Sequence, residues 1–167
     1  SEEVNRVTVY LYWQAGRFGE AVAYGEKALE LFPHSSGICE ILGCAYGLNG
    51  QFPEAVRTLH RAVALAGGDP IYNWALGYVY ARQGSLKEAR EIAETLDRLE
   101  REGRFSSTWL AILHVALGEL DRAFELLDAA YEERDCYIAA VKTDPVFAPL
   151  RPDPRFGDLV KRMGLDL

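Results

Sequence analysis

The stretch ILGCAYGLNGQFPEA at residues 41–55 returns in altered form as ALGYVYARQGSLKEA at residues 75–89, which is 34 positions further along the chain. Both segments keep a Leu-Gly pair, an aromatic residue, a later glycine and a final alanine at matching places. Self-similarity at a fixed interval of this length is the sequence signature of a repeat architecture. The same columns should therefore recur elsewhere in the chain.

Four columns recur over the whole chain at that interval. They hold a glycine (Gly16, Gly50, Gly84, Gly118), a bulky apolar residue (Phe18, Phe52, Leu86, Leu120), an alanine (Ala21, Ala55, Ala89, Ala123) and a second apolar residue (Ala28, Ala62, Leu96, Ala130). Apolar residues at helical spacing lie on both sides of each glycine, which predicts two helices per copy. Glycine can adopt the left-handed conformation that ends the first helix, and the small alanine lets the two helices approach closely.

These columns predict an all-α fold, namely a right-handed superhelix of antiparallel helix hairpins with C-terminal capping helices. We expect a single domain over residues 1–167. Its parts are four repeats at residues 2–35, 36–69, 70–103 and 104–134, followed by a cap at residues 135–167. In the third copy the second helix is expected from about Leu86 to Glu102, with Ser85 and Glu88 as a capping box and the charged run from Asp97 facing solvent.

The first helices of the second and third copies resemble the tetratricopeptide repeat. Leu42-Gly43 with Tyr46, and Leu76-Gly77 with Tyr80, match the core of that family's first helix. The second helix of copy two is similar to the family at Ala55, Leu59 and Ala62, whereas the family pattern is altered at Cys39, Asn73, Thr8, Val9 and His114. The resemblance implies that the first helices line a concave surface that holds protein partners.

The tail carries a second, narrower resemblance. Its residues are Ala129-Ala130-Tyr131-Glu132-Glu133-Arg134-Asp135, Asp144-Pro145, Pro149-Leu150-Arg151, Asp153-Pro154-Arg155-Phe156 and Arg162-Met163-Gly164-Leu165. They are similar to the ends of repeat modules that bacterial proteins join to winged-helix transcription regulators, nucleotide cyclases or serine/threonine kinases. Physically, its apolar residues are expected to bury the exposed face of the last hairpin, which a further repeat would otherwise cover. These residues are Phe147, Leu150, Phe156, Leu159, Val160 and Met163.

Carrying the family's groove positions onto this sequence gives a candidate partner-binding surface. It consists of Arg6, Tyr10 and Trp13 from copy one, Glu40, Cys44 and Leu48 from copy two, Trp74, Tyr78 and Arg82 from copy three, and Thr108 and Ile112 from copy four. Tyrosine, tryptophan and arginine supply much of the energy at protein interfaces. Two interpretations stay open, because Trp13 and Trp74 could instead pack against neighbouring helices or against residues upstream of the chain.

One subclass of the family clamps the acidic tails of chaperones with basic and amide side chains. Most of those places hold other residues here, namely Tyr10, Ile41, Ile71 and Ala75. We therefore expect no binding of this kind.

Charge and composition argue against several other functions. The chain has 18 basic and 25 acidic residues and a formal charge of −7, which repels nucleic acid and anionic membrane surfaces. It lacks the long apolar run of a membrane span and the start of a secretion signal, so we expect a soluble, cytoplasmic protein. The three cysteines are expected to be reduced and buried, with no metal and no cofactor.

The histidines give no sign of catalysis. His34, His60 and His114 fall in different hairpins, whereas a nucleophilic or metal site needs several such groups within bonding distance. His114 is expected to be a packed core residue. The sequence therefore predicts a protein that is not an enzyme.

Three hypotheses about function remain. The first is a scaffold that binds a peptide or protein segment in the concave groove. The second is a regulatory or self-assembly module that controls an attached output domain and could form homo-oligomers. The third is a sensor that binds a small ligand in the same ring-lined groove.

Overall fold

The computed structural model describes residues 1–165, and this part of the chain is helical without strands. The α-helices are α1 (Glu2–Gln14), α2 (Phe18–Leu31), α3 (Ser36–Leu48), α4 (Phe52–Leu65), α5 (Trp74–Gln83), α6 (Leu86–Arg101), α7 (Ser107–Leu117), α8 (Leu120–Glu132) and α9 (Pro154–Arg162). Short 3-10 helices form η1 (Pro70–Asn73), η2 (Cys136–Ala140) and η3 (Pro145–Leu150). The all-α superhelix is confirmed. The predicted repeat bounds stay predictions, and residues 166–167 of the predicted cap lie outside the described residues.

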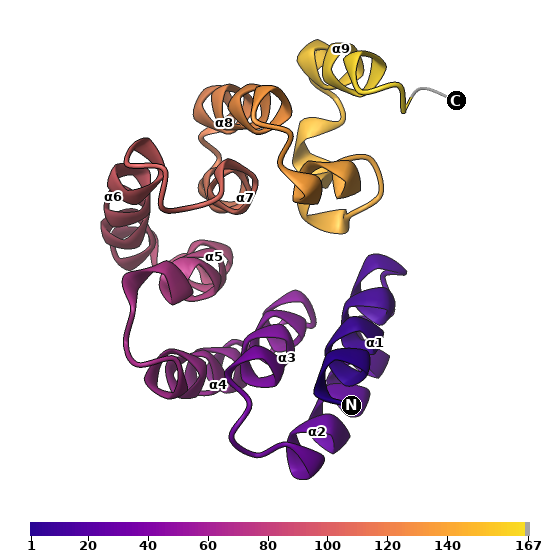
Figure 1. The fold of residues 1–167 in the computed structure, drawn as a ribbon, viewed down its shortest axis with the longest axis vertical. Coiled ribbons are helices and arrows are strands. Elements are labelled where there is room, and N and C mark those ends of the chain that lie inside the picture. Colours follow the sequence, from indigo (N-terminus) through magenta and orange to yellow (C-terminus); the bar gives the residue numbers. More distant parts are fainter. Residues whose placement is uncertain (166–167) are drawn as a thin grey trace.

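The helices pack in pairs that follow one another along a curve (Figure 1). In each of the pairs α3–α4, α5–α6 and α7–α8 the two helices contact each other, with α3, α5 and α7 on the inner side and α4, α6 and α8 on the outer side. The inner helices also contact one another in series, since α3 contacts α1 and α5, and α5 contacts α7. The inner helices therefore form one continuous concave wall.

The periodic glycines end the first helix of each pair, as the sequence predicts. Gly16, Gly50, Gly84 and Gly118 all have positive φ values, between 69° and 93°. At Gly84 the turn is closed by the Ser85 backbone N–H, which donates to the Tyr80 carbonyl oxygen at 2.9 Å. An L side chain is strained in this left-handed conformation, so glycine is favoured at each of these turns.

Small residues let the paired helices approach closely. The four periodic alanines (Ala21, Ala55, Ala89 and Ala123) are completely buried. A Cβ atom added at Gly43 would lie 2.4 Å from Leu59 Cγ, which shows how close α3 lies to α4. A larger side chain at either kind of position would force the helices apart.

Two predictions about α6 are wrong in detail. Ser85 precedes the helix but makes no side-chain cap, because its hydroxyl accepts a hydrogen bond from Gln83 Nε2 at 2.9 Å. The charged run at the end of α6 is not wholly solvated. Asp97 and Glu100 are partly buried and form ion pairs with Arg122 of α8 at 2.8 Å and 3.5 Å.

His114 of α7 is a packed core residue, as predicted, with 4% of its surface exposed. Its Nδ1 lies 2.8 Å from Glu119 Oε2, and its Nε2 lies 3.1 Å from Asp97 Oδ2. The imidazole therefore links α7 to α6 and to the start of α8. No Ser, Thr or Cys side chain is hydrogen-bonded to this ring within residues 1–165, so the cluster has no nucleophile.

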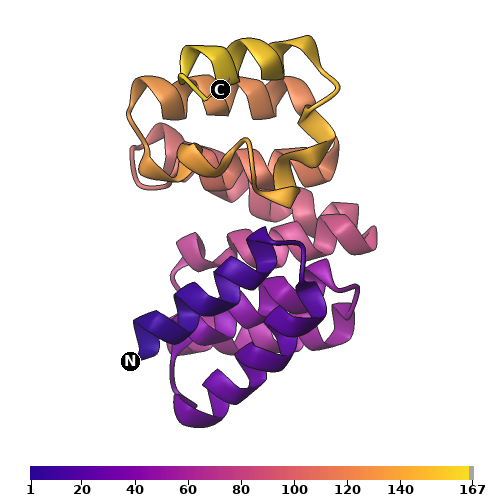
Figure 2. The same cartoon turned by 90° about the vertical axis from the view of Figure 1, so that its right-hand side faces the viewer.

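The tail does more than cap the last hairpin. Helix α9 lies beside α8 (Figures 1 and 2), and ion pairs join Arg155 to Asp121 and Arg162 to Asp128. Before α9, however, η2 and η3 turn back to the inner side of the curve, between α7 and α1 (Figure 1). Asp144 caps η3, where its side chain accepts a hydrogen bond from the Val146 N–H. The reversal across the concave face was not predicted.

Candidate partner-binding pocket on the concave face

Two columns of side chains run along the inner helices, and their members are 34 residues apart. The first column consists of Arg6, Glu40, Trp74 and Thr108, and the second consists of Tyr10, Cys44, Tyr78 and Ile112. The columns are four residues apart in each helix, so they lie on the same helix face about one turn from each other. All eight residues belong to the groove predicted from the sequence.

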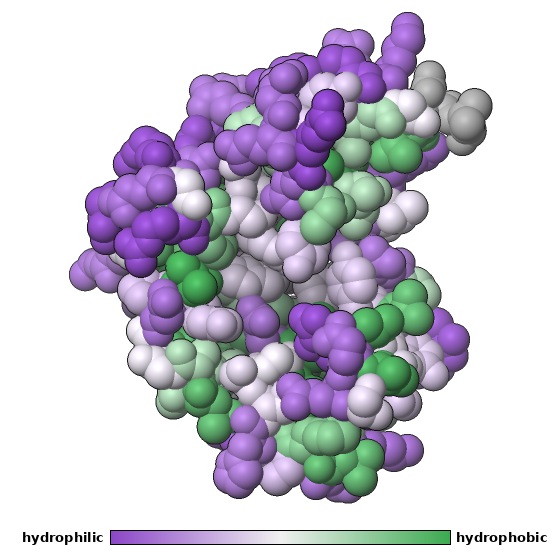
Figure 3. Space-filling view, viewed as in Figure 1, coloured by the Kyte–Doolittle hydropathy of each residue, from purple (hydrophilic) through white to green (hydrophobic). Residues whose placement is uncertain are grey.

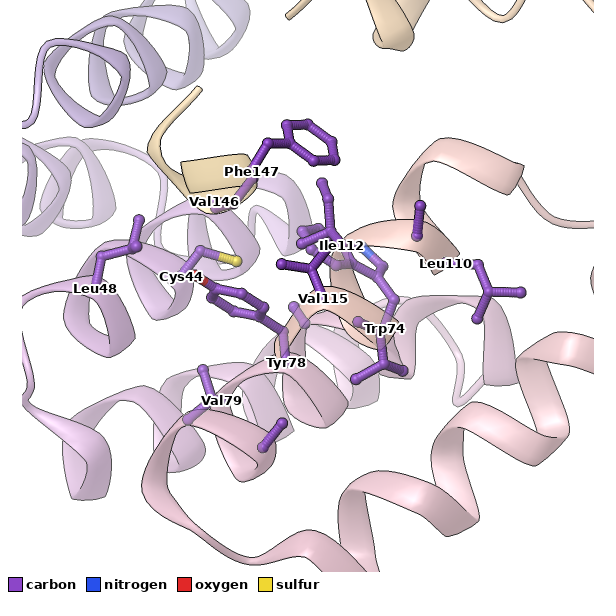
Figure 4. Packing of buried hydrophobic residues seen from close by; sticks show 14 of the residues in the cluster. Cys44, Leu48, Trp74, Tyr78, Val79, Leu110, Ile112, Val115, Val146 and Phe147 are labelled. Atoms are coloured by element: carbon purple, nitrogen blue, oxygen red, sulfur yellow. The ribbon is translucent and has the colours of Figure 1, made fainter. Parts of the chain in front are cut away.

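The second column is covered by the chain's own tail. Figure 4 shows the part of η3 that carries Val146 and Phe147 near Cys44, Tyr78 and Ile112, although the Phe147 ring itself points away from Cys44 and Tyr78. Phe147, Tyr78 and Ile112 each keep 2% or less of their surface exposed, and Cys44 keeps none. Burial raises the pKa of Tyr78 to about 12 and holds the pKa of the Cys44 thiol well above its usual range. Cys44, Tyr78 and Ile112 are therefore hydrophobic core, whereas Tyr10 of the same column is only partly buried.

Asp144 anchors the tail to the first helix. Its Oδ1 accepts from Trp13 Nε1 at 3.1 Å and from the Val146 backbone N–H at 3.1 Å, and its Oδ2 accepts from the Tyr10 hydroxyl at 3.3 Å. Asp144 is 3% exposed, and burial raises its pKa although the hydrogen bonds oppose that shift. Burial also raises the pKa of Tyr10 to about 12. These bonds close the concave face between residues more than a hundred positions apart.

Beside the tail a pocket of about 420 Å³ stays open. It is lined by Glu3, Arg6, Val7, Tyr10 and Trp13 of α1, Gly37, Glu40, Ile41 and Cys44 of α3, Trp74 of α5, Trp109 of α7 and Tyr137 of η2. Figure 3 shows side chains of near-neutral hydropathy at the centre of the molecule, with strongly hydrophilic side chains both beside them and over the outer helices. The first column thus borders a cavity, and the tail supplies part of its wall.

Aromatic rings from four elements gather at this pocket. The ring centroids of Trp74 and Trp109 are 4.6 Å apart, and those of Trp109 and Tyr137 are 4.9 Å apart. Tyr10 meets Trp13 edge-on with centroids 5.5 Å apart. Rings in such contact support one another, so the lining keeps a defined shape.

Glu40 places a carboxylate among these rings. Its Oε1 accepts a hydrogen bond from Trp74 Nε1 at 2.7 Å. Burial raises the pKa of Glu40, while the Trp74 bond and the charge of Arg6 act in the opposite direction. Arg6 itself is exposed and pairs with Glu3, at 2.8 Å from Arg6 Nη2 to Glu3 Oε1. The pocket therefore combines two carboxylates and one guanidinium.

The structure brings six of the eleven predicted groove residues together around the pocket. These are Arg6, Tyr10, Trp13, Glu40, Cys44 and Trp74. Four others do not face open space, which corrects the prediction. Leu48, Tyr78, Thr108 and Ile112 are buried, because helix packing and the returning tail take up the space that a partner would need. Arg82 is exposed but does not line the pocket, and its guanidinium lies over the Tyr78 ring.

Some pocket residues were missed. Val7, Ile41 and Trp109 belong to a column that is offset by one residue from the first column and keeps the interval of 34, so the repeat itself could have indicated them. Tyr137 belongs to η2 and has no repeat equivalent. Cys136 is exposed, which corrects the prediction that all three cysteines are buried. For the tail, no sequence pattern indicated contact with the concave face.

Other kinds of site find no structural support in the described part of the chain. Across residues 1–165 no group of three His, Cys, Asp or Glu side chains could hold a metal ion. In the same residues, no helix combines the length and apolar character needed to cross a bilayer. The pocket is thus the main candidate site.

Comparisons with known proteins agree with the helical repeat. Three models described as tetratricopeptide repeat match residues 9–35, 42–104 and 106–129. A similar curated protein is BBSome complex member BBS4 of Bos taurus, which is 31% identical over 112 residues. The alignment covers 67% of this chain but 21% of the bovine protein, so the chain spans about a fifth of that relative's length.

Proposed function

This chain belongs to the tetratricopeptide repeat family and is a protein interaction scaffold, and we propose that it binds a segment of a partner protein in the concave pocket. The observation that carries the proposal is the pocket of about 420 Å³, which rings from α1, α5, α7 and η2 surround. Family and relative point to a repeat protein without catalytic activity. The bovine relative is named as a member of a complex, which supports protein partners.

The size of the pocket limits what it can hold. Because the tail covers the second column, the concave face has no continuous groove along Cys44, Tyr78 and Ile112. A cavity of a few hundred cubic ångströms suits a small number of inserted groups rather than a whole helix. The partner segment would therefore insert one or two side chains between the rings, which would act as the anchors of the interface.

The test replaces an aromatic residue of the pocket that contributes little to the hydrophobic core. Tyr137 is 52% exposed, so Tyr137→Ala should leave the fold stable and weaken partner binding. Trp74 is a poorer choice because it is 7% exposed and its loss would also disturb packing. Proteins retained by the immobilised wild-type chain are quantified beside those retained by the variant, and each candidate is then tested as a purified protein.

The matched control is Tyr72→Ala, since Tyr72 is 37% exposed and lies in η1, outside the pocket. It should retain every partner that wild type retains. If Tyr137→Ala and a folded Trp109→Ala variant both bind each partner as tightly as wild type, the pocket is not the binding site.

A second candidate function is self-assembly or control of an attached domain, and one observation favours it. Val4, Val7 and Leu11 form an apolar stripe on α1 with exposed fractions of 60%, 44% and 58%. Residues at this spacing share a helix face and could pack against another helix. Light scattering of wild type and Leu11→Asp at rising concentration tests it, and a wild type that stays monomeric throughout contradicts self-assembly. The bacterial context and the cytoplasmic location stay predictions.

A further inference from the structure

We infer that the pocket selects an organic cation, and that the partner segment therefore presents a lysine or arginine side chain to Glu40 between the aromatic rings. The inference rests on the proposed function and adds the chemical class of the inserted group. Three features of the pocket carry it, namely an incompletely paired carboxylate, a wall of aromatic rings and an excess of negative charge.

The carboxylate of Glu40 is only partly satisfied. One oxygen accepts from Trp74 Nε1 at 2.7 Å, while the other accepts no hydrogen bond within the described residues. The nearest basic side chain in the pocket, Arg6, is already engaged by Glu3, which accepts bonds from Arg6 Nη2 at 2.8 Å and 2.9 Å and from Arg6 Nε at 3.2 Å. The charge of Arg6 acts on Glu40 from a distance, but the two form no ion pair within the described residues. A partly buried carboxylate without a direct ion pair is costly, and an incoming cation would relieve that cost.

The rings favour the same kind of ligand. Trp109 contacts both Trp74 and Tyr137 on one side of the pocket, and Tyr10 lines another part of it. The faces of tryptophan and tyrosine rings carry negative potential, so they attract ammonium and guanidinium groups and repel anions. A ring-lined cavity with a carboxylate thus suits an alkylammonium or guanidinium better than a neutral apolar group, which would leave Glu40 unpaired.

The local charge balance disfavours an anionic ligand. Glu3, Arg6 and Glu40 together carry a net charge of −1, and Asp144 lies directly behind Tyr10 and Trp13. The whole chain has a formal charge of −7. Arg6 could attract an anion only by giving up Glu3, whereas a cation can approach Glu40 without breaking an existing pair.

The test is a titration of the full chain with matched cationic and neutral probes. One arm uses the blocked tripeptides acetyl-Gly-Lys-Gly-amide and acetyl-Gly-Arg-Gly-amide, with acetyl-Gly-norleucine-Gly-amide as the uncharged counterpart of the lysine peptide. The other arm uses choline and its neutral isostere 3,3-dimethylbutan-1-ol, which distinguishes a free small cation from a side chain. The readouts are calorimetry and the NMR signal of the Trp74 indole N–H, which is bonded to Glu40.

Matched variants locate the effect. Glu40→Gln keeps an acceptor for Trp74 but removes the charge, and should weaken cation binding by about tenfold or more, as expected for a charge-assisted contact. Glu94→Gln makes the same charge change on the exposed face of α6 and should bind like wild type. Tyr137→Leu should weaken binding, whereas Tyr137→Phe, which keeps the ring, should not.

The outcomes separate the inference from the proposed function. Binding of the lysine or arginine peptide, with loss in Glu40→Gln, supports both. Equal binding of the norleucine and lysine peptides, or undiminished binding by Glu40→Gln, overturns the cation inference and leaves the partner pocket standing. Binding of choline alone supports cation selection but contradicts a partner side chain as its source. If neither calorimetry nor the NMR signal detects binding of any cationic probe, the inference is overturned.

Discussion

The two columns of the concave face recur at the same interval of 34 residues but differ in how far the tail covers them. In the second column Cys44, Tyr78 and Ile112 are buried beneath the tail, whereas in the first column Arg6 is exposed and Glu40 borders an open pocket. The columns are one helical turn apart on the same helices. The difference therefore does not come from the repeat. It comes from a segment outside the repeats that crosses one column and stops short of the other.

The comparison shows that a groove position in a helical repeat is available to a partner only where the chain has not already filled it. Here the tail segment from Asp144 to Phe147 lies over the second column, where Asp144 accepts a hydrogen bond from Tyr10. The tail then contributes Tyr137 to the wall of the pocket that is left. Covering one column and shaping the other are two results of the same reversal of the chain.

The largest expected effect is the removal of a fully buried ring from the tail segment that lies over the second column. Phe147→Ala should lower the free energy of unfolding by about 3–5 kcal/mol, because it leaves a cavity where a fully buried ring had packed. Denaturant unfolding measures the change. Phe147→Leu, which keeps most of the apolar volume, should cost much less.

The same variant should also open the second column to reagents. In the wild-type chain a thiol reagent should label the exposed Cys136 quickly and the buried Cys44 slowly, since burial raises the pKa of the Cys44 thiol. Phe147→Ala should speed the labelling of Cys44 and leave Cys136 unchanged. Unchanged labelling of Cys44 in a folded variant would show that the packing of Phe147 does not hold the tail over this column.

A smaller loss is expected when the anchor of the tail is removed. Asp144→Ala leaves the Trp13 and Tyr10 donors without an acceptor and removes the cap of η3, which should cost about 2–4 kcal/mol. Thermal unfolding and proteolysis of the tail measure this effect. Asp144→Asn keeps an acceptor and should lose less, so equal losses would contradict an anchoring role for the hydrogen bonds.

In the first column, in contrast, a substitution is expected to raise the stability of the fold. Because burial raises the pKa of Glu40 above its ordinary value of 4.5, the folded state binds the proton more tightly than the unfolded state. The contribution of Glu40 to stability therefore falls as pH rises from the ordinary pKa through the raised one. Glu40→Gln should raise the Tm at pH 7, and this gain should shrink toward pH 4. A Tm at pH 7 below that of wild type would mean that the carboxylate stabilises the fold.

The smallest effect is expected at Arg82, the predicted groove residue that does not line the pocket. Its guanidinium lies over the Tyr78 ring, but the side chain is exposed. Arg82→Ala should change the free energy of unfolding by no more than about 0.5 kcal/mol and leave partner affinity unchanged. A clear loss of affinity would extend the binding surface beyond the pocket.

Much of the fold could be predicted because it depends on local sequence. Each glycine turn and each alanine crossing is specified within a single repeat, so the interval of 34 residues was enough to indicate helix pairs and their order. One error arose where contacts join distant residues, because the carboxylates at the end of α6 pair with Arg122 of α8. The error at Ser85 is local, because its hydroxyl accepts a hydrogen bond from Gln83, two residues earlier, instead of capping α6.

The candidate site also contains residues that the repeat indicated and one that it could not indicate. Glu40 and Trp74 were indicated by the repeat, and their hydrogen bond joins equivalent places in neighbouring repeats. Tyr137 could not be indicated in this way, because its place in the pocket depends on where η2 lies after the chain has turned back.

The sequence by itself determined the helix pairs, their closing turns and the identity of the side chains on the inner wall. Only the tertiary structure decided which of those side chains stay open. The physical reason is that repeat periodicity encodes contacts between neighbouring segments, whereas Asp144 reaches Tyr10 and Trp13 across more than a hundred residues of chain. A contact of that range leaves no period in the sequence, and it is the contact that closes one column and leaves a pocket beside it.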